Sequence, residues 1–142
     1  MQISRKADYA LRAMTILGSL SPDRTMLAQE LASAGKIPVK FLEQILLVLK
    51  RSGLLRSKRG VGGGYRLARE SRLISVAEVI EAVDGELVTF IATDDFPTFS
   101  GSDGMVKCLK EAQALINERL DDTSIEDLVQ NGSDDVMVGY GI

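Results

Sequence analysis

The sequence of 142 residues contains no histidine and no tryptophan, and its one cysteine is Cys108. A single cysteine excludes an intrachain disulfide, and the lack of histidine removes the commonest metal ligand and general base. No stretch approaches the ~18 consecutive apolar residues of a membrane helix, and the N-terminus lacks the apolar core of a signal peptide. We therefore expect a cytoplasmic protein that is not an enzyme and that holds no metal or cofactor.

The net charge of −3 conceals two halves of opposite sign. Residues 1–72 hold 14 Lys and Arg against 5 Asp and Glu, whereas residues 73–142 hold 3 against 15. A basic half suits a polyanionic partner such as nucleic acid, while an acidic half should stay away from phosphates. Simple solvation would give the same asymmetry, so charge alone does not decide the function.

Apolar residues at helical spacing predict three helices in the first third of the chain. The first helix is expected over residues 4–20. Thr25 can cap a short second helix, which Gly35 ends. Pro38 suits the first position of a third helix, which runs until Gly53.

A β-hairpin and a fourth helix are expected next. Strand-like segments at 54–58 and 65–68 flank a basic, glycine-rich tip at 59–64. Residues 75–78 read Ser-Val-Ala-Glu, a capping box that opens a helix closed by Gly85. Three helices, a two-stranded hairpin and a helix predict a winged helix-turn-helix fold, mainly α with a small β-hairpin. We assign this DNA-binding domain to residues 1–85.

The second half of the chain has a looser pattern. Residues 86–104 show no clear periodicity and are expected to form a loop. An apolar stripe predicts a long helix from Met105 to Leu120. Thr123-Ser124-Ile125-Glu126 repeats the capping-box pattern and predicts a short helix over 125–129. Together these form a 105–129 unit, and residues 130–142 are expected to be a flexible C-terminal tail.

In a winged helix-turn-helix protein the third helix enters the major groove and the hairpin lies along the backbone or minor groove. Glu43 can accept a hydrogen bond from a cytosine amino group, and Gln44 can bond adenine bidentately. Arg59 is placed to reach into a narrow minor groove, and Arg66 adds positive charge. The predicted DNA-binding residues are Lys40, Glu43, Gln44, Lys50, Arg51, Arg56, Ser57, Lys58, Arg59, Gly60, Gly62, Gly63 and Tyr65.

Four blocks of the sequence together resemble the Rrf2 family of bacterial transcription regulators, which includes IscR, NsrR and CymR. They are SRKADYALRAM at 4–14, FLEQIL at 41–46, KRGVGGGYRLA at 58–68 and VAEVIEAVDG at 76–85. The resemblance implies a homodimer that binds a pseudo-palindromic double-stranded DNA operator. We expect this homodimer to act as a repressor. It also implies dimerisation through the long helix, whose interface residues would be Met105, Leu109, Ala112, Ile116 and Leu120.

One part of the family pattern is missing from this chain. Iron-sulfur members carry three closely spaced cysteines between the fourth helix and the dimerisation helix, and residues 86–107 contain none. The resemblance is therefore to the cluster-less, CymR-like type. Cys108 is expected to be a small buried hydrophobic residue rather than a ligand or redox sensor. Asp8 lies near where some members recruit a carboxylate, but Arg12 stands where a histidine would help, so we assign no metal site.

The C-terminal residues Gly139, Tyr140, Gly141 and Ile142 resemble the peptides by which partner proteins insert into the active site of cysteine synthase (O-acetylserine sulfhydrylase). This resemblance implies that cysteine synthase is a partner and that the protein has a role in cysteine or sulfur metabolism. A tail with incidental residues is the alternative. A second alternative function is a protein-interaction module that regulates an enzyme such as cysteine synthase through this tail. An enzyme is the weakest option, because only loop carboxylates such as Asp94 and Asp95 remain to carry chemistry.

Overall fold

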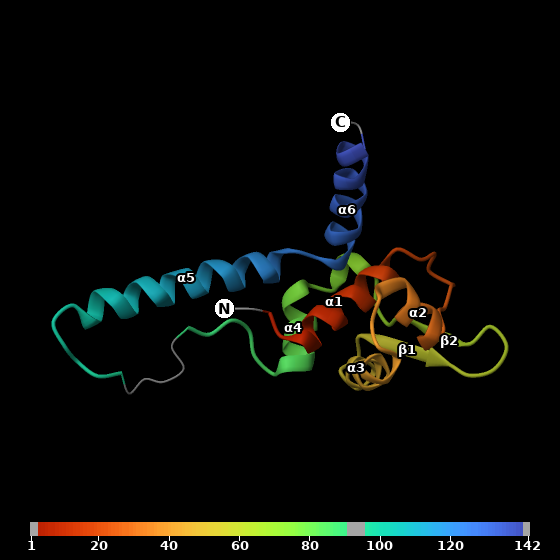
Figure 1. Cartoon of the computed structure of the whole chain (residues 1–142), viewed down its shortest axis with the longest axis horizontal. Coiled ribbons are helices and arrows are strands. Elements are labelled where there is room, and N and C mark those ends of the chain that lie inside the picture. The colour runs from red at the N-terminus through yellow and green to blue at the C-terminus, as the bar shows by residue number, and fades with distance from the viewer. Residues whose placement is uncertain (1–2, 91–95, 141–142) are drawn as a thin grey trace.

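The computed structural model describes residues 3–90 and 96–140, and the side chains of 133–140 are not part of that description. The predicted order of three helices, a hairpin and a helix is confirmed (Figure 1). The elements are α1 (Arg5–Gly18), α2 (Ala28–Gly35), α3 (Val39–Arg51), β1 (Leu55–Lys58), β2 (Gly64–Leu67), a 3-10 helix η1 (Ser71–Leu73), α4 (Val76–Asp84), α5 (Ser102–Asp122) and α6 (Ile125–Tyr140).

The core lies around α1, which contacts α2, α3, α4 and α6. Helices α1 to α4 contribute the apolar stripes that their sequence periods predict, so Met14 of α1 and Leu31 of α2 are fully buried. In α3 the buried residues are Leu42, Ile45, Leu46 and Leu49. Burial of this one face fixes the rotation of α3 and turns its opposite face toward solvent.

Side-chain caps define where α1 and α4 begin. The Ser4 hydroxyl oxygen accepts from the Ala7 amide at 3.0 Å and donates to the Asp84 carboxylate, which ties the start of α1 to the end of α4. The predicted capping box of α4 is confirmed, since the Glu78 amide donates to Ser75 Oγ at 3.0 Å and the Glu78 carboxylate accepts from the Ser75 amide. These caps fix two helix starts by local chemistry alone.

The prediction that Thr25 caps α2 is wrong. The helix begins after Leu27, and the Thr25 hydroxyl instead donates to the Gly62 carbonyl oxygen at 2.9 Å. Thr25 lies beside the hairpin because its neighbour Met26 forms an antiparallel bridge with Tyr65. The two N to O distances of this bridge are 3.0 and 2.7 Å. The segment before α2 is therefore joined to the hairpin by one isolated β-bridge.

Pro38 was predicted to be the first residue of the third helix, but it lies one position before α3. It is the N-cap residue, with φ −58° and ψ 127°, and the first helical residue is Val39. The Pro38 carbonyl oxygen accepts the first helical hydrogen bond from the Leu42 amide at 3.0 Å. Proline is tolerated here because the amide it lacks would have had no partner within the helix.

The loop after α4 and helix α5 form an arm, comprising residues 86–90 and 96–122, that extends away from the helical core (Figure 1). Asn117 of α5 holds the loop in both directions, since its side-chain amide donates to the Val88 carbonyl oxygen at 3.0 Å and its oxygen accepts from the Val88 amide at 3.1 Å. Gln113 accepts from the Phe90 amide at 2.9 Å. Helix α5 begins at Ser102, three residues before the prediction.

The start of α6 returns to the core. Ile125 is fully buried, and its amide donates to the Ile74 carbonyl oxygen at 2.9 Å. The second capping box is shifted by one residue from its predicted position. The Asp127 amide donates to Ser124 Oγ at 3.0 Å, and the Asp127 carboxylate accepts from the Ser124 amide at 2.9 Å. Thr123 instead bonds the Arg119 carbonyl oxygen at the end of α5.

Helix α6 is longer than the predicted 125–129 helix. It extends to Tyr140, so that the segment after Val129, expected to be a polar tether, is helical. The residues from 130 to 140 include no proline, and Gly132 lowers helix propensity by only about 1 kcal/mol relative to alanine. Glycine and asparagine therefore weaken this helix without ending it.

Candidate nucleic-acid interface

The exposed face of α3 carries the predicted base-reading residues. Lys40, Glu43 and Gln44 are all exposed, and the same face continues with Leu47 and Arg51. Each of these residues lies three or four positions from another of them, so they form one stripe along the helix. The core-facing residues of α3 lie on the opposite side, which leaves this stripe free to enter a groove.

The hairpin adds a second exposed surface beside α3. We call residues 55–67 the wing. Leu55 is buried at its base, whereas Arg56, Ser57 and Lys58 of β1 are exposed. Arg59, Gly60 and Gly62 at the tip are also exposed, and Thr25 anchors the tip through its hydroxyl. The wing therefore presents cationic side chains and accessible glycine backbone together.

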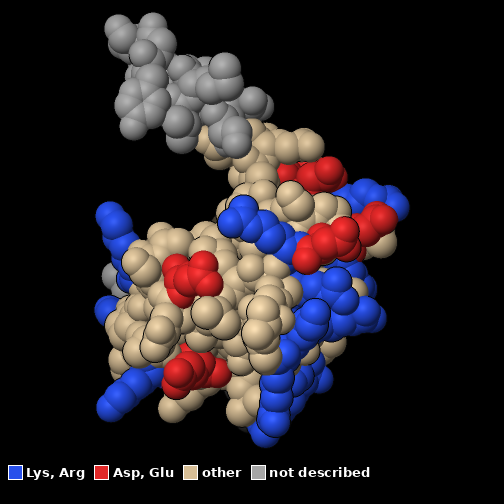
Figure 2. Space-filling model, turned by 90° about the vertical axis from the view of Figure 1, so that its right-hand side faces the viewer, with Lys and Arg blue, Asp and Glu red and all other residues tan. Residues whose placement is uncertain are grey.

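The cations of α3 and the wing have no carboxylate within ion-pair distance among the described residues. By contrast, Arg12 pairs with Asp8 at 2.8 Å, and Arg69 pairs with Glu78. The unpaired side chains are Lys40, Lys50, Arg51, Arg56, Lys58, Arg59 and Arg66. Figure 2, which views the molecule from the side of the wing tip, shows Lys and Arg side chains in a band along one edge, while Asp and Glu form separate small groups.

Two of the predicted contact residues have structural partners inside the protein. The Tyr65 side chain is half-buried and packs against the hydrophobic core. Gly63 lies so close to the backbone of β1 that an added Cβ would come within 2.5 Å of the Lys58 carbonyl oxygen. Both residues shape the wing, and a direct contact of either one with DNA stays a prediction.

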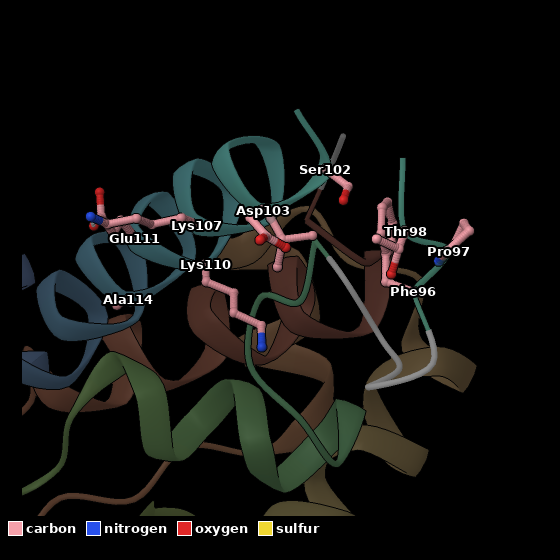
Figure 3. Close-up of a pocket in the computed structure, with 10 residues that line it drawn as sticks. Phe96, Pro97, Thr98, Ser102, Asp103, Lys107, Lys110, Glu111 and Ala114 are labelled. Carbon is pink, nitrogen blue, oxygen red and sulfur yellow. Dashed lines mark ion pairs between the residues drawn. The ribbon is translucent and has the colours of Figure 1, made fainter. Parts of the chain in front are cut away.

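A cavity of about 590 Å³ lies in the arm between residues 96–98 and α5 (Figure 3). Phe96, Pro97 and Thr98 line one side of it. The α5 side carries Asp103, Lys107, Lys110 and Glu111, and Lys107 and Glu111 form a loose ion pair at 3.9 Å. No thiol lines this cavity, and no group of three or more His, Cys, Asp or Glu that could hold a metal ion occurs among the described side chains of residues 3–90 and 96–132.

The prediction that Cys108 is buried is wrong, because its thiol is exposed. Helix α5 uses one face, with Gln113 and Asn117, to hold the loop of the arm, and Cys108 lies on the other side of the helix together with Leu115. The apolar period along α5 suggests burial, but the only buried residue of α5 is Ser102.

The five predicted dimer-interface residues lie along one side of α5. Ile116 and Leu120 turn toward α4 and line a cavity with Ile80, whereas Met105 is 39% exposed near the outer end of the arm. Leu115 is outside the predicted stripe and is more exposed, at 68%. The most exposed apolar side chain of α5 therefore lies to one side of the predicted stripe, around the helix axis. This difference arises because another side of α5 packs against the loop of the arm.

Several sequence-based hypotheses concern residues outside the described part. Gly141 and Ile142 of the predicted partner-binding tail are not described, and neither is the Tyr140 side chain. Asp94 and Asp95, the carboxylates of the enzyme alternative, also lie outside it. Within the described part, no helix is long and apolar enough to cross a membrane.

Leu47 and Thr25 lie at the candidate interface but are not among the contact residues predicted from the sequence. Leu47 could have been found by extending the Lys40–Glu43–Gln44 stripe by one more turn. The role of Thr25 depends on a pairing with the hairpin 37 residues away in the sequence, and no local pattern signals it.

Comparison with known proteins places this geometry in a family. The chain is 35% identical over 130 residues to Rv1287 of Mycobacterium tuberculosis (strain H37Rv), which is named as an HTH-type transcriptional regulator. The match covers 90% of this chain and 81% of Rv1287. It is 34% identical over 136 residues to the transcriptional regulator IscR of Xenorhabdus nematophila, covering 92% and 80%. The solved structure of CymR, the global cysteine regulator of B. subtilis, matches with a TM-score of 0.78 and 25% identity, covering 92% of this chain and 98% of CymR.

These relatives are transcription regulators and not enzymes. The family model for Rrf2, described as iron-dependent transcriptional regulators, matches residues 3–131, which is nearly the whole described structure. The protein therefore belongs to the Rrf2 family of winged-helix transcription regulators.

Proposed function

We propose that the protein is a homodimer that binds a specific DNA operator in the cytoplasm, with α3 in the major groove and the wing on the backbone or in the minor groove. The observation that carries this proposal is the exposed stripe of α3 beside a wing whose cations have no carboxylate partner. Such cations are available to displace counterions from phosphates, which supplies the sequence-independent part of DNA affinity.

The strand register of the wing supports a polyanionic partner. Arg56 of β1 lies directly opposite Arg66 of β2 in the antiparallel pair. Like charges at directly opposite positions destabilise a hairpin. A phosphate beside the two guanidinium groups would offset this repulsion. The register therefore lowers the stability of the hairpin in the free protein and favours DNA binding.

Sequence discrimination would then come from the α3 stripe. Glu43 is an acceptor suited to the amino group of cytosine, and Gln44 matches the donor and acceptor of adenine in the major groove. Among the described residues, neither side chain has a hydrogen-bond partner that would hold it away from DNA. Lys40 at the start of the helix can reach a phosphate or guanine.

The exposure of α5 supports the homodimer. This helix has 21 residues, and its one buried residue is Ser102. Apolar side chains such as Met105 and Leu115 therefore lie open along an arm that projects from the core. A second copy of the helix would cover them, and the paired α3 helices would then meet half-sites about one DNA turn, ~34 Å, apart.

We propose that this regulator works without an iron-sulfur cluster, although iron dependence is part of the family description. Clusters are held by several cysteine thiolates, and this sequence has one cysteine. Cys108 does not line the arm cavity, whose charged groups are lysines and carboxylates. The donor set therefore does not fit a cluster bound by one chain.

We further propose repression of genes of cysteine or sulfur metabolism. The support is the structural match to CymR, which is named as a cysteine regulator. The hypothesis that the tail at Gly139–Ile142 binds cysteine synthase stays a prediction, because it depends on residues outside the described structure.

Binding to duplexes selected from a random library tests the DNA-binding proposal. Glu43→Ala should relax the base preference at one operator position, because it removes an acceptor from the stripe. Arg59→Ala should weaken binding to every sequence and reduce the slope of log affinity against log salt by about one phosphate contact, a slope change of ~0.9. The measurement is fluorescence anisotropy over a salt series.

Lys110→Ala is the matched control, since Lys110 is an exposed cation of α5 that lines the arm cavity, away from the wing. It should leave both the preference and the slope unchanged. Equal slopes for wild type and Arg59→Ala would argue against the wing as a DNA contact. Binding with no salt dependence would favour a protein-interaction module instead.

A further inference from the structure

Helix α3 exposes four large apolar side chains, and they do not share one environment. Phe41 and Val48 line a groove together with Tyr9 of α1, and Val39 is the first residue of the helix. Leu47 is 45% exposed and is not among the residues of that groove. Its exposure therefore has no explanation in the packing of α3 against α1.

Leu47 lies in the middle of the reading stripe. It follows Glu43 by four residues and Gln44 by three, and it precedes Arg51 by four. Side chains at these spacings are neighbours on the surface of a helix. Any approach that brings Glu43 and Gln44 to base edges also brings Leu47 to the floor or wall of the same groove.

We propose that Leu47 is a specificity-determining residue that reads thymine, by packing its side chain against the C5-methyl group. This inference rests on the proposed insertion of α3 into the major groove. In that groove the thymine methyl is the one apolar group that a base pair presents, and apolar side chains recognise it. Leucine has no donor or acceptor, so it cannot distinguish the other base edges by hydrogen bonding.

The same contact would discriminate against cytosine. A cytosine at this position presents an amino donor in place of the thymine carbonyl oxygen and has no methyl group. Leu47 can satisfy neither the cytosine amino group nor the thymine carbonyl oxygen, so the loss of water from this edge costs free energy with both bases. Specificity at this base pair would thus come from the apolar contact with the methyl group that cytosine lacks.

Replacement of thymine by deoxyuridine tests the proposal, because it removes only the methyl group. Duplexes selected from a random library by the purified protein are synthesised with thymine or deoxyuridine at each position that they share. Wild type should bind the deoxyuridine duplex about fourfold more weakly per half-site, the factor that corresponds to burying one methyl group, or about fifteenfold when both half-sites are changed. Leu47→Ala should bind the two duplexes equally.

Val48→Ala is the matched control, because Val48 is the next residue and faces the groove beside α1. It should keep the wild-type preference for thymine over deoxyuridine. Thermal unfolding of both variants checks that they fold, which the partial exposure of both side chains favours.

Three results would overturn the assignment of Leu47 while leaving the DNA-binding function intact. They are selected duplexes without a shared thymine, wild-type affinity that is the same for thymine and deoxyuridine, and a Leu47→Ala variant that keeps the difference. Failure of the wild type to select or bind any duplex would instead overturn the proposed function together with this inference.

Discussion

Gly64 is the residue on which the geometry of the wing most directly depends. It is buried at the start of β2 with φ +133°, and a Cβ added there would lie 2.5 Å from the Met26 carbonyl oxygen. The obstacle is backbone, which cannot move aside as a flexible side chain could. Only glycine lets the chain before α2 pair with the hairpin at this point.

We predict that Gly64→Ala destabilises the protein by more than about 2 kcal/mol, since it combines backbone strain with a clash that breaks the Met26–Tyr65 bridge. Gly60→Ala is the control. Gly60 also has positive φ, +87°, but nothing lies within 4 Å of an added Cβ, so its cost should be about 1 kcal/mol. Urea unfolding measures both. Equal losses would show that the close approach at Gly64 has no energetic role.

At the scale of elements, the sequence was most informative where the relevant chemistry is local. The capping box at Ser75 and Glu78 and the basic tip of the hairpin are short patterns, and both are present as predicted. The cap assigned to Thr25 failed because its hydroxyl donates to the Gly62 carbonyl oxygen in the tip of the hairpin, which is distant in sequence. Competition of this kind is invisible to any reading of neighbouring residues.

In the candidate site, too, features set by neighbouring residues were predicted correctly and features set by distant packing were not. The stripe of α3 follows from helical spacing, so Lys40, Glu43 and Gln44 were placed correctly on an exposed face. The burial of Cys108 was predicted wrongly because periodicity gives the apolar side of a helix but not how much of that side is covered. Helix α5 is covered by a loop that side-chain amides hold and, at its C-terminal end, by α4, against which Leu120 packs.

We predict that Asn117→Ala loosens the loop of the arm without unfolding the core. The change removes the donor to the Val88 carbonyl oxygen and the acceptor for the Val88 amide. Each hydrogen bond contributes about 1 kcal/mol, so amide exchange over residues 86–90 should rise at least about tenfold. Hydrogen-deuterium exchange measures this. Glu118→Ala, at the next and exposed position, should leave exchange unchanged, and the same rise in both variants would argue against a specific role of Asn117.

At the scale of the whole molecule, charge and exposure divide the protein into two surfaces of different chemistry. The basic half forms α1 to β2, with unpaired cations on α3 and the wing. The acidic half includes the arm, where Leu115 has Glu111 and Glu118 as helical neighbours. An acidic arm would repel DNA, and its exposed apolar residues suit a second protein chain. The two surfaces lie on different parts of the molecule, so dimerisation can position two α3 helices without covering them.

We predict that Leu115→Lys weakens dimerisation at least about a hundredfold, because it replaces apolar burial by a charge that must be desolvated. Lysine can pair with Glu111 and Glu118 along α5, so the helix itself should keep its stability. Sedimentation equilibrium measures the dimer. Leu73→Lys is the matched control, since Leu73 is exposed to a similar degree on η1, away from α5.

The same variant connects the dimer to DNA binding. A monomer contacts one half-site and neutralises about half as many phosphates, so the salt slope of Leu115→Lys should fall to about half of the wild-type value. Leu73→Lys should keep the full slope. A Leu115→Lys protein that sediments as a dimer and binds with the wild-type slope would show that the exposed face of α5 lies outside the interface. A wild-type protein that sediments as a monomer would remove the homodimer from the proposal altogether.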